Sequence, residues 1–405
     1  MRVLVLNAGS SSLKVDLVET ATGEELAQGL VERIGAVASV GHVTRAGRKV
    51  AREALPAPDH AAALAFVLER LAAMQAEEPP LGTVEAVGHR VVHGGERFSD
   101  SALIDDEVIE AIRDAVELAP LHNPANLLGI EAARAAFPDV PHAAVFDTAF
   151  HQTLPPEAYL YALPTRLYRR HKIRRYGFHG TSHQYVSRRL VALAGLDPAH
   201  HRVVTLHLGN GCSACAVRDG RSVDTSMGMT PLDGLVMGTR SGSLDPSVVF
   251  EIVEKEALSL AEIQTLLNRF SGLLGLSGYA ADMRDLLAEA EAGDAKCRQA
   301  IAVFAYRVRC TIGQYLAAMG GLDAVAFTAG IGTFAAPVRA AVLDGLDGMG
   351  LTLDPAANAA ADGREARISA PDSRIQAWVV PTNEELVIAT DTAKLAEASR
   401  LSPFA

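Results

Sequence analysis

The sequence has no uninterrupted apolar run of about 18 residues, the length that a membrane-spanning helix requires. Its first residues, MRVLVLNAGSSS, also lack the charged, apolar and small-residue order of a secretory signal. From these two absences we expect a cytoplasmic protein with no membrane partner.

Positive charge is also in short supply. The chain has 37 Lys and Arg residues against 48 Asp and Glu residues, which gives a net charge of −11. Proteins that coat nucleic-acid phosphates normally carry a basic excess, so we expect no nucleic-acid partner. A net charge does not exclude a local basic pocket that holds a small anion.

Cysteine is scarce, with four residues in 405, and this number excludes a disulfide framework. Cys212 and Cys215 form a C-x-x-C sequence, but the surrounding GCSACAV alternates like a strand. No second close pair and no His pair stands nearby at zinc-ligand spacing. We therefore interpret both as small packing residues.

Linkers rich in Pro or Ser are absent as well. The length of 405 residues and the hydrophobic fraction of 49% nevertheless favour two domains with large cores. Apolar patterns predict strands at residues 2–6, 13–19, 84–92, 143–146, 203–208 and 324–328. Helical patterns cover residues 61–75, 106–118, 182–193, 261–267, 282–319 and about 384–398. This mixture predicts an α/β architecture.

An internal similarity suggests two related halves. Residues 204–220, VTLHLGNGCSACAVRDG, repeat the design of residues 3–23, VLVLNAGSSSLKVDLVETATG. Each segment has an apolar strand, a small polar loop with Gly, an alternating strand and a Gly turn. Because such hairpins are common, the pattern alone leaves the duplication open. It places a domain boundary near residue 150, and the last helix can pack back on the first domain.

Three loops of small residues follow predicted strands, at residues 7–12, 207–211 and 330–332, and Lys14 stands close behind the first. Backbone N–H groups in such loops can approach a phosphate. Together the loops suit a nucleotide that lies across a cleft, although each alone also fits a polar turn.

Four ionisable residues stand where a site would need them. Arg90 shares a strand face with Val92, which suits a short carboxylate with an aliphatic tail. Asp147 follows the apolar run HAAVF, at a strand end where α/β folds bind ligands. His179 lies in YGFHGTSH, and Arg240 lies in the loop MGTRSGSLDP, from which it can reach a phosphoryl group. The alternatives are a surface Arg90, a capping Asp147, an ordinary hydrogen-bonded His179 and a solvated Arg240.

The stretch PTNEELVIA predicts the start of the last helix. Thr382 and Glu385 have the spacing of a capping box. This gives Glu385 a structural role and leaves Glu384 as the carboxylate available to Mg²⁺.

Taken together, these motifs resemble the acetate kinase family. They are VLNAGSSSLK, GHRVVHGG, FDTAFHQTLP, YGFHGTSH, HLGNG, DTSMGMTPLDGLVMGTRSG, FTAGIG and PTNEE, in the family's order over nearly the whole chain. The resemblance implies an α/β fold of two duplicated actin-like ATPase (ribonuclease H-like) domains, each a mixed sheet flanked by helices, with a cleft between them. The implied domains are residues 1–150, with the C-terminal helix of about 384–405 packed back, and residues 151–383.

The resemblance also implies an activity, the reversible ATP-dependent phosphorylation of acetate to acetyl phosphate. The implied cofactor is Mg²⁺, with Mn²⁺ as an alternative ion, and ATP is the co-substrate. Acetate or acetyl phosphate, ATP or ADP, and a second copy in a homodimer are the implied partners. A carboxylate is already ionised at pH 7, so direct in-line transfer without a phosphoenzyme is the expected mechanism.

Residue roles follow from the resemblance position by position. The catalytic positions are Asp147, His179 and Arg240. The substrate positions are Arg90, Val92, Leu121, His122, Phe178 and Pro231. The nucleotide positions are Lys14, His207, Leu208, Gly209, Asn210, Gly211, Asp282, Met283, Arg284, Gly330, Ile331, Gly332, Thr333 and Phe334. The metal positions are Asn7 and Glu384.

The chain departs from the family pattern at two places. Thr333 and Phe334 follow GIG where the family usually has Glu and Asn, and Ser243 follows RSG where Asp is common. The first departure keeps another phosphoryl donor as an alternative. Propionate or butyrate kinase activity is a second alternative, although Val92 favours acetate. Against a non-catalytic nucleotide-gated protein stands the carboxylate pocket, which a gate does not need.

Overall fold

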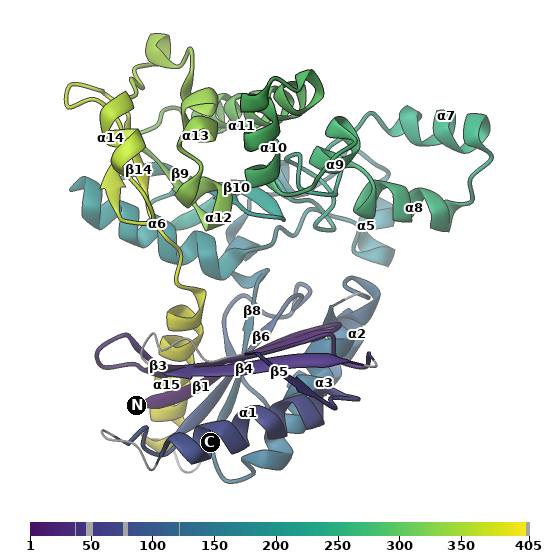
Figure 1. The fold of residues 1–405 in the computed structure, drawn as a ribbon, viewed down its shortest axis with the longest axis vertical. Coiled ribbons are helices and arrows are strands. Elements are labelled where there is room, and N and C mark those ends of the chain that lie inside the picture. The colour runs from purple at the N-terminus through teal and green to yellow at the C-terminus, as the bar shows by residue number, and fades with distance from the viewer. Residues whose placement is uncertain (37, 46–51, 76–79, 121, 402–405) are drawn as a thin grey trace. The chain divides into compact units, whose positions relative to one another are not determined.

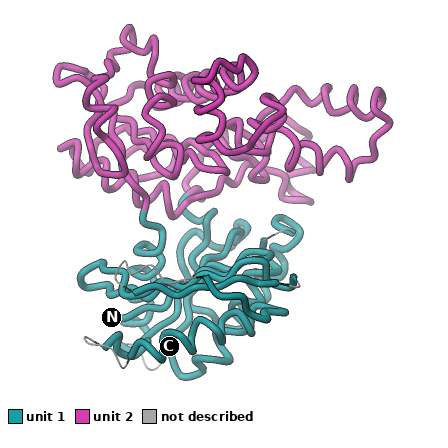
Figure 2. Tube along the Cα trace, in the orientation of Figure 1, with its two compact units in different colours: residues 1–150, 383–405 teal, residues 151–382 magenta. Residues whose placement is uncertain are grey.

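The computed structural model describes residues 1–405 except residues 37, 46–51, 76–79, 121 and 402–405. The chain divides into two compact units (Figure 2). Unit 1 comprises residues 1–150 and 383–405, and unit 2 comprises residues 151–382. Each unit contains one mixed β-sheet flanked by helices (Figure 1), so the predicted α/β class is confirmed.

The sheet of unit 1 has the strand order β5-β4-β3-β2-β1-β6-β8-β7. Its strands are β1 (Arg2–Gly9), β2 (Ser12–Glu19), β3 (Glu24–Glu32), β4 (Ser39–Arg45), β5 (Glu53–Leu55), β6 (Ala86–Val91), β7 (Ala102–Leu103) and β8 (His142–Phe146). The helices are α1 (His60–Met74), α2 (Asp106–Asp114), η1 (Ala115–Glu117), α3 (Asn123–Ala136) and α15 (Glu384–Leu401).

The two faces of this sheet are covered by different helices, because alternate residues of a strand point to opposite faces. Leu4 and Leu6 of β1 join one buried cluster with Leu64 of α1. Val3 and Val5 join another with Ile388 of α15. The C-terminal helix therefore packs on unit 1.

The sheet of unit 2 has the strand order β11-β10-β9-β12-β14-β13. Its strands are β9 (Arg202–Leu208), β10 (Cys212–Arg218), β11 (Arg221–Thr225), β12 (Ala324–Thr328), β13 (Ala366–Arg367) and β14 (Gln376–Val379). The helices from residue 149 to residue 269 are η2 (Ala149–Thr153), α4 (Pro156–Tyr159), α5 (Thr165–His171), α6 (Gly180–Ala194), α7 (Pro246–Glu256) and α8 (Leu260–Arg269). Those that follow are α9 (Gly272–Ser277), α10 (Met283–Ala292), α11 (Ala295–Met319), α12 (Ala329–Phe334), α13 (Ala336–Leu343), η3 (Asp347–Met349) and α14 (Pro355–Ala360).

The two sheets share one topology over five strands. In unit 1 the order β3-β2-β1-β6-β8 runs through two antiparallel pairs and then two parallel pairs. In unit 2 the order β11-β10-β9-β12-β14 repeats the same sequence of pairings. The repeated sequence segments are the hairpins β1–β2 and β9–β10, so the duplication suggested by sequence is present in the fold.

Several element boundaries differ from the sequence-based expectations. The strand predicted to end at residue 6 continues to Gly9, which pairs with Ser12, so the first glycine loop is a tight turn. The helical stretch 282–319 is two helices. Gly293, at φ +112°, ends α10, and the Asp294 side chain accepts from the N–H of Cys297 to begin α11. A left-handed glycine after a helix is a frequent stop signal.

Two findings concern the rarer features of the sequence. Within the described part of the chain, no helix combines the length and the apolar character needed to cross a membrane. All four cysteines are free thiols, and Cys212 and Cys215 are buried in β10. Burial raises the pKa of Cys212 to about 12, so this thiol is neutral at pH 7 and acts as a packing group.

Candidate active site

In unit 1, Arg90 and Asp147 form a bidentate ion pair. The parallel pairing of β6 with β8 brings Arg90 beside the end of the strand that Asp147 follows. Arg90 Nε donates to Asp147 Oδ1 at 3.0 Å and Nη2 donates to Oδ2 at 2.6 Å. Arg90 Nη1 also donates to the amide oxygen of Asn7 at 3.3 Å. Arg90 is therefore not a surface residue, and Asp147 does not act as a cap.

The electrostatics of this pair involve two further predicted site residues. Burial raises the pKa of Asp147, and the Arg90 guanidinium opposes that shift. Glu384, the first residue of α15, adds negative charge that also raises the pKa of Asp147, whereas His122 lowers it. Unit 1 thus brings together Asn7, Arg90, His122, Asp147 and Glu384.

The oxygen atoms in this cluster suit Mg²⁺. Asp147 and Glu384 supply carboxylates and Asn7 supplies an amide oxygen. Mg²⁺ prefers hard oxygen ligands and is commonly held by one or two carboxylates together with substrate phosphates. The residues present therefore fit the ion that the family resemblance implies.

Two asparagines that sequence reasoning missed hold the chain after β6. The N–H of Val92 donates to Asn126 Oδ1 at 3.0 Å, and that of His93 donates to Asn123 Oδ1 at 3.1 Å. Asn126 Nδ2 also donates to the carbonyl of Ala8 at 2.8 Å. Both asparagines are buried in α3. No local signal marks them, because Asn near the start of a helix usually serves the helix itself.

The capping box predicted for the last helix is wrong. The N–H of Leu386 is capped by Asn383 Oδ1 at 3.0 Å, and the Thr382 hydroxyl is buried with no hydrogen-bond partner among the described residues. Glu385 instead forms an ion pair with Lys14, which also faces Asp16 at 3.5 Å. Asn383 takes the N-cap position because it directly precedes Glu384, the first residue of α15, and its amide oxygen reaches the N–H three residues on. Lys14, predicted to contact the nucleotide, thus has two carboxylate partners in unit 1.

In unit 2, His179 stands at the start of α6 in the left-handed region, at φ +58°. Its Nδ1 lies 2.8 Å from the Ser213 hydroxyl, and its ring stacks on that of His207 with centroids 4.2 Å apart. The nearby Gly177 is required, since a Cβ there would lie 2.7 Å from the His151 ring. The strand pair β9–β10 therefore presents His207 and Ser213 to His179.

Arg240 approaches the same place. A Cβ built on Gly211 would lie 3.5 Å from Arg240 Nη1 and 3.6 Å from His179 Nε2. Arg240 Nη1 donates to the carbonyl of Pro231 at 3.3 Å, and burial lowers the pKa of this guanidinium. Among the residues that the structure describes, Arg240 makes no ion pair with a carboxylate. A partly buried cation without a counter-ion is suited to an anionic ligand.

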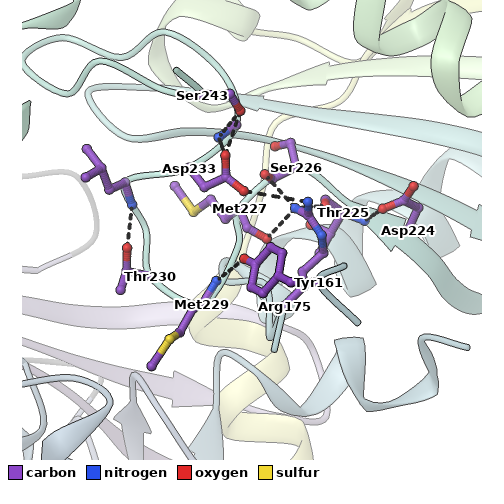
Figure 3. A network of polar contacts seen from close by, with 12 residues as sticks. Tyr161, Arg175, Asp224, Thr225, Ser226, Met227, Met229, Thr230, Asp233 and Ser243 are labelled. Atoms are coloured by element: carbon purple, nitrogen blue, oxygen red, sulfur yellow. Dashed lines mark hydrogen bonds and ion pairs between the residues drawn. The ribbon is translucent and has the colours of Figure 1, made fainter. Parts of the chain in front are cut away.

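A polar network anchors the loop that carries Pro231 and Arg240 (Figure 3). Arg175 Nη1 donates to the carbonyls of Thr225, Ser226 and Met227 at 2.8 to 3.1 Å. Asp233 faces Arg175 at 3.6 Å and accepts from the Ser243 hydroxyl at 2.6 Å. Ser243, one of the departures from the family pattern, therefore supplies a donor to Asp233 where an Asp would add a second carboxylate.

A cavity of about 620 Å³ in unit 2 collects most of the predicted nucleotide residues. Its lining is Gly209, Asn210, Ala281, Asp282, Met283, Arg284, Leu287, Gly330, Ile331, Phe334 and Ala335. Phe334 is 65% exposed, so it offers an aromatic face at this cavity. Ala281, Leu287 and Ala335 are missed by sequence reasoning. Ala281 and Ala335 adjoin predicted residues, and Leu287 lies one helical turn after Met283 in α10.

Another residue missed by sequence reasoning is Arg339 in α13, which is 1% exposed. Its Nη1 donates to the carbonyls of Gly332 and Thr333 at 3.0 and 2.8 Å. Its Nε and Nη2 donate to the side chain and carbonyl of Asn358, both at 2.8 Å. Arg339 thus fixes the backbone behind the glycine loop that lines the cavity.

Not every predicted residue lies in these clusters. Leu121 lies outside the described residues. Leu208, Gly332 and Thr333 adjoin cavity residues in sequence but do not line the cavity, and His207 and Gly211 lie beside His179 instead. Val92 and His122 belong to unit 1, whereas Phe178 and Pro231 belong to unit 2.

Comparisons with known proteins show what this chain is similar to. A model of the acetokinase family matches residues 2–390. The chain is 52% identical to an acetate kinase from Lachnoclostridium phytofermentans, over 98% of this chain and all of that one. It is also similar to the crystal structure of Porphyromonas gingivalis acetate kinase, with a TM-score of 0.92, 42% identity, and 97% and 99% of the two chains covered. A propionate kinase from Francisella tularensis has a TM-score of 0.89 and 42% identity, with the same coverage.

The family model matches far more than half of the chain, and relatives above 30% identity align over almost all of it. These matches include every cluster described above. The chain therefore belongs to the acetokinase family.

Proposed function

We propose that this protein transfers the γ-phosphoryl group of ATP to acetate, giving acetyl phosphate and ADP, and that the reaction runs in both directions. The observation that carries the proposal is the difference between two arginines. In unit 1, Arg90 is bound by the carboxylate of Asp147. In unit 2, which also has the 620 Å³ cavity, Arg240 lies near His179 and makes no ion pair with a carboxylate of the described residues.

Arg90 is the proposed acetate-binding residue. Its Nε and Nη2 are occupied by Asp147, and its Nη1 makes only the longer 3.3 Å bond to Asn7. An incoming carboxylate can therefore take the Nη1 edge while the opposite edge stays fixed by Asp147. Val92 and, by family resemblance, Leu121, Phe178 and Pro231 are the proposed contacts for the methyl group. His122 is a further proposed substrate contact near Asp147.

His179 and Arg240 are proposed to stabilise the phosphoryl group in the transition state of its transfer. An acetate oxygen forms the new P–O bond as the bond to the ADP oxygen breaks, and negative charge spreads over the equatorial oxygens. No carboxylate in the described part of the chain neutralises Arg240, so its charge is available to those oxygens. Because acetate is already ionised at pH 7, Asp147 need not act as a base. Its proposed catalytic role is to orient Arg90 and the reacting groups.

Asn7, Asp147 and Glu384 are the residues that would hold Mg²⁺. When bound, the ion would neutralise phosphate charge during transfer. ATP is proposed to occupy the cavity of unit 2, with its base against the apolar residues Met283, Ile331 and Phe334. The other family nucleotide positions, including Lys14, His207 and Thr333, are proposed to contact the phosphates or support the loops.

The test is acyl-phosphate formation with acetate, propionate and butyrate, each against ATP, GTP and pyrophosphate. We expect the highest kcat/KM with acetate and ATP. Absence of acyl phosphate in every combination would refute the proposal. Direct transfer predicts inversion at a chiral γ-phosphorus, and net retention would show a phosphoenzyme instead.

Propionate kinase activity is the second candidate, because the chain is 42% identical both to a propionate kinase of known structure and to the Porphyromonas gingivalis acetate kinase, although it is 52% identical to another acetate kinase. Residue 92 is the feature in this chain that favours acetate, since a buried valine leaves less space than a smaller side chain. The same assay separates the two candidates by the ratio of kcat/KM for the two acids.

A homodimer is proposed from the surface of unit 2. Leu244, Phe270 and Leu276 line one groove of about 440 Å³, and each is at least 41% exposed. Phe250 of α7 and Tyr306 of α11 are also largely exposed. Apolar patches of this kind are typical of interfaces, and a second copy is the proposed occupant. Light scattering should give a mass near twice 42.7 kDa.

Because the reaction consumes ATP, we also propose a cytoplasmic location.

A further inference from the structure

The hydroxyl of Ser213 contacts two histidines at once. Its Oγ lies 2.8 Å from Nδ1 of His179 and 2.8 Å from Nε2 of His183. His183 Nδ1 in turn lies 2.7 Å from the Thr205 hydroxyl. Ser213, His183 and Thr205 are each fully buried. The four groups therefore form one chain, His179–Ser213–His183–Thr205, that leads from the proposed catalytic histidine into the core.

The neighbouring His151 shows what is unusual about this chain. His151 Nε2 lies 3.0 Å from the carbonyl of Phe178, and its Nδ1 lies 2.8 Å from the Ser222 hydroxyl. A carbonyl oxygen only accepts, so His151 must carry its proton on Nε2. His183 instead lies between two hydroxyls, which can donate or accept. Its surroundings therefore permit either tautomer.

Two orientations of the hydrogen bonds give a partner to each of the three ring nitrogens in this chain, Nδ1 of His179 and both nitrogens of His183. In the inward-facing orientation Thr205 donates to His183 Nδ1, His183 Nε2–H donates to Ser213, and Ser213 donates to His179 Nδ1. In the outward-facing orientation His179 Nδ1–H donates to Ser213, Ser213 donates to His183 Nε2, and His183 Nδ1–H donates to Thr205. Both orientations carry the same number of protons.

We propose that Ser213, His183 and Thr205 are positioning residues that form a reversible hydrogen-bond chain, which supports His179 both as a neutral donor and as an imidazolium. In the inward-facing orientation His179 is neutral with its proton on Nε2. In the outward-facing orientation Nδ1 of His179 carries a proton, and Nε2 can bind another proton from solvent. A protonated His179 then has a partner for Nδ1–H, while Nε2–H remains directed at the phosphoryl group.

The charged and ionisable groups around His179 explain why its protonated form needs this hydrogen-bond chain. His207 stacks on it, His183 lies with its ring centroid 6.5 Å away, and Arg240 Nη1 approaches the same side of Gly211. A second positive charge next to Arg240 is costly unless each of its protons is accepted. Burial lowers the pKa of His183 well below its usual value, so His183 stays neutral and can serve as the acceptor.

This inference rests on the proposed kinase activity, and three variants test it. Ser213→Ala removes the partner of His179 Nδ1. Thr205→Val keeps Ser213 but removes the acceptor for a proton on His183 Nδ1. His183 then keeps its proton on Nε2, which favours the inward-facing orientation. Ser222→Ala is the matched control, since it removes a buried hydroxyl from His151 and not from the chain.

The first readout is the pH profile of kcat for acetyl-phosphate formation. Losing a charge-assisted hydrogen bond should lower the apparent pKa of His179, so activity should fall at lower pH than in the wild type. We expect a shift of about 1 pH unit in Ser213→Ala and about half a unit in Thr205→Val. KM values should change less than about twofold, and Ser222→Ala should keep the wild-type profile. A pH-independent loss in Ser213→Ala together with an unshifted Thr205→Val profile would overturn the proposal.

The second readout does not need activity. Nitrogen-15 shifts of the imidazole rings report tautomer and protonation, and loss of a signal in His179→Asn identifies His179. We expect its titration midpoint to move down in Ser213→Ala and Thr205→Val but not in Ser222→Ala. Unchanged midpoints would overturn the chain even in an active enzyme. An inactive wild type with shifted midpoints would refute the kinase assignment and retain the chain. If Ser213→Ala does not fold, Thr205→Val alone decides the result.

Discussion

Gly211→Ala tests where the phosphoryl group binds. The new methyl group would lie 3.5 Å from Arg240 Nη1 and 3.5 Å from His179 Cε1, which is ordinary van der Waals contact. No neighbour has to move, and Gly211 does not have a positive φ. The substitution should therefore leave the fold intact while it fills the space that the two side chains share.

The expected loss follows from what that space is proposed to hold. If a phosphoryl oxygen lies between Arg240 and His179, the methyl group will separate it from at least one donor. Removing one preorganised donor from a transition state typically costs about 10² to 10³ in rate, or roughly 3 to 4 kcal/mol. Replacing Gly with Ala in a compatible conformation tends to stabilise a fold by about 0.4 to 1 kcal/mol, so the melting temperature should not fall.

The assay is steady-state acetyl-phosphate formation with thermal unfolding of the same samples. Gly313→Ala in α11 is the matched control, because nothing lies within 4 Å of its added Cβ. We expect kcat to fall about 100-fold in Gly211→Ala, with KM for acetate nearly unchanged, and to stay at the wild-type value in Gly313→Ala. A kcat within about threefold of wild type in Gly211→Ala would refute the placement.

Other substitutions test the remaining clusters. The lysine of Arg339→Lys lacks the guanidinium fork that binds the carbonyls of Gly332 and Thr333. The KM for ATP should therefore rise about tenfold while the KM for acetate stays unchanged. Equal increases in both KM values would contradict a role in the nucleotide loop. Burial raises the pKa of Asp16 to about 7, so the folded state holds this proton longer than the unfolded chain and stability falls as pH rises from about 4 to 7. Asp16→Asn should therefore gain about 3 kcal/mol relative to wild type between pH 4.5 and 8 in urea unfolding, whereas a constant difference would contradict the shift. Val92→Ala should raise the propionate-to-acetate ratio of kcat/KM about tenfold, and an unchanged ratio would remove Val92 from the methyl pocket.

Local patterns were sufficient to predict the hairpins that open the two sheets, but not the strand order of either sheet. The hairpins at residues 3–23 and 204–220 combine alternating apolar residues with glycine turns, and those features act within a few residues. The same locality explains the boundary errors. Asn7 and Gly9 are as polar and small as loop residues, yet pairing with β2 and packing against α3 keep them in the strand.

Partners that are distant in sequence were not predictable in this way. Lys14 and Glu385 are 371 residues apart, and nothing near either residue indicates that they pair. Arg339 reads as an exposed arginine on a helix, but it is buried and bonded to main-chain carbonyls. In the sequence, Ser213 is one small residue of an alternating strand, with nothing to distinguish it. Its two histidine contacts arise only when α6 packs on β9 and β10.

The two proposed site arginines differ in a way that matches their proposed ligands. Arg90 already has Asp147 and Asn7 as partners, with the charge of Glu384 nearby, so part of its attraction for an anion is cancelled. Acetate carries one charge and must leave easily as acetyl phosphate, which suits a moderated cation. Arg240 has no carboxylate partner among the described residues and is partly desolvated, which leaves its full charge for the phosphoryl oxygens as they become equatorial during transfer. If Arg240 meets those oxygens more closely in the transition state than in bound ATP, as we propose, that difference raises kcat.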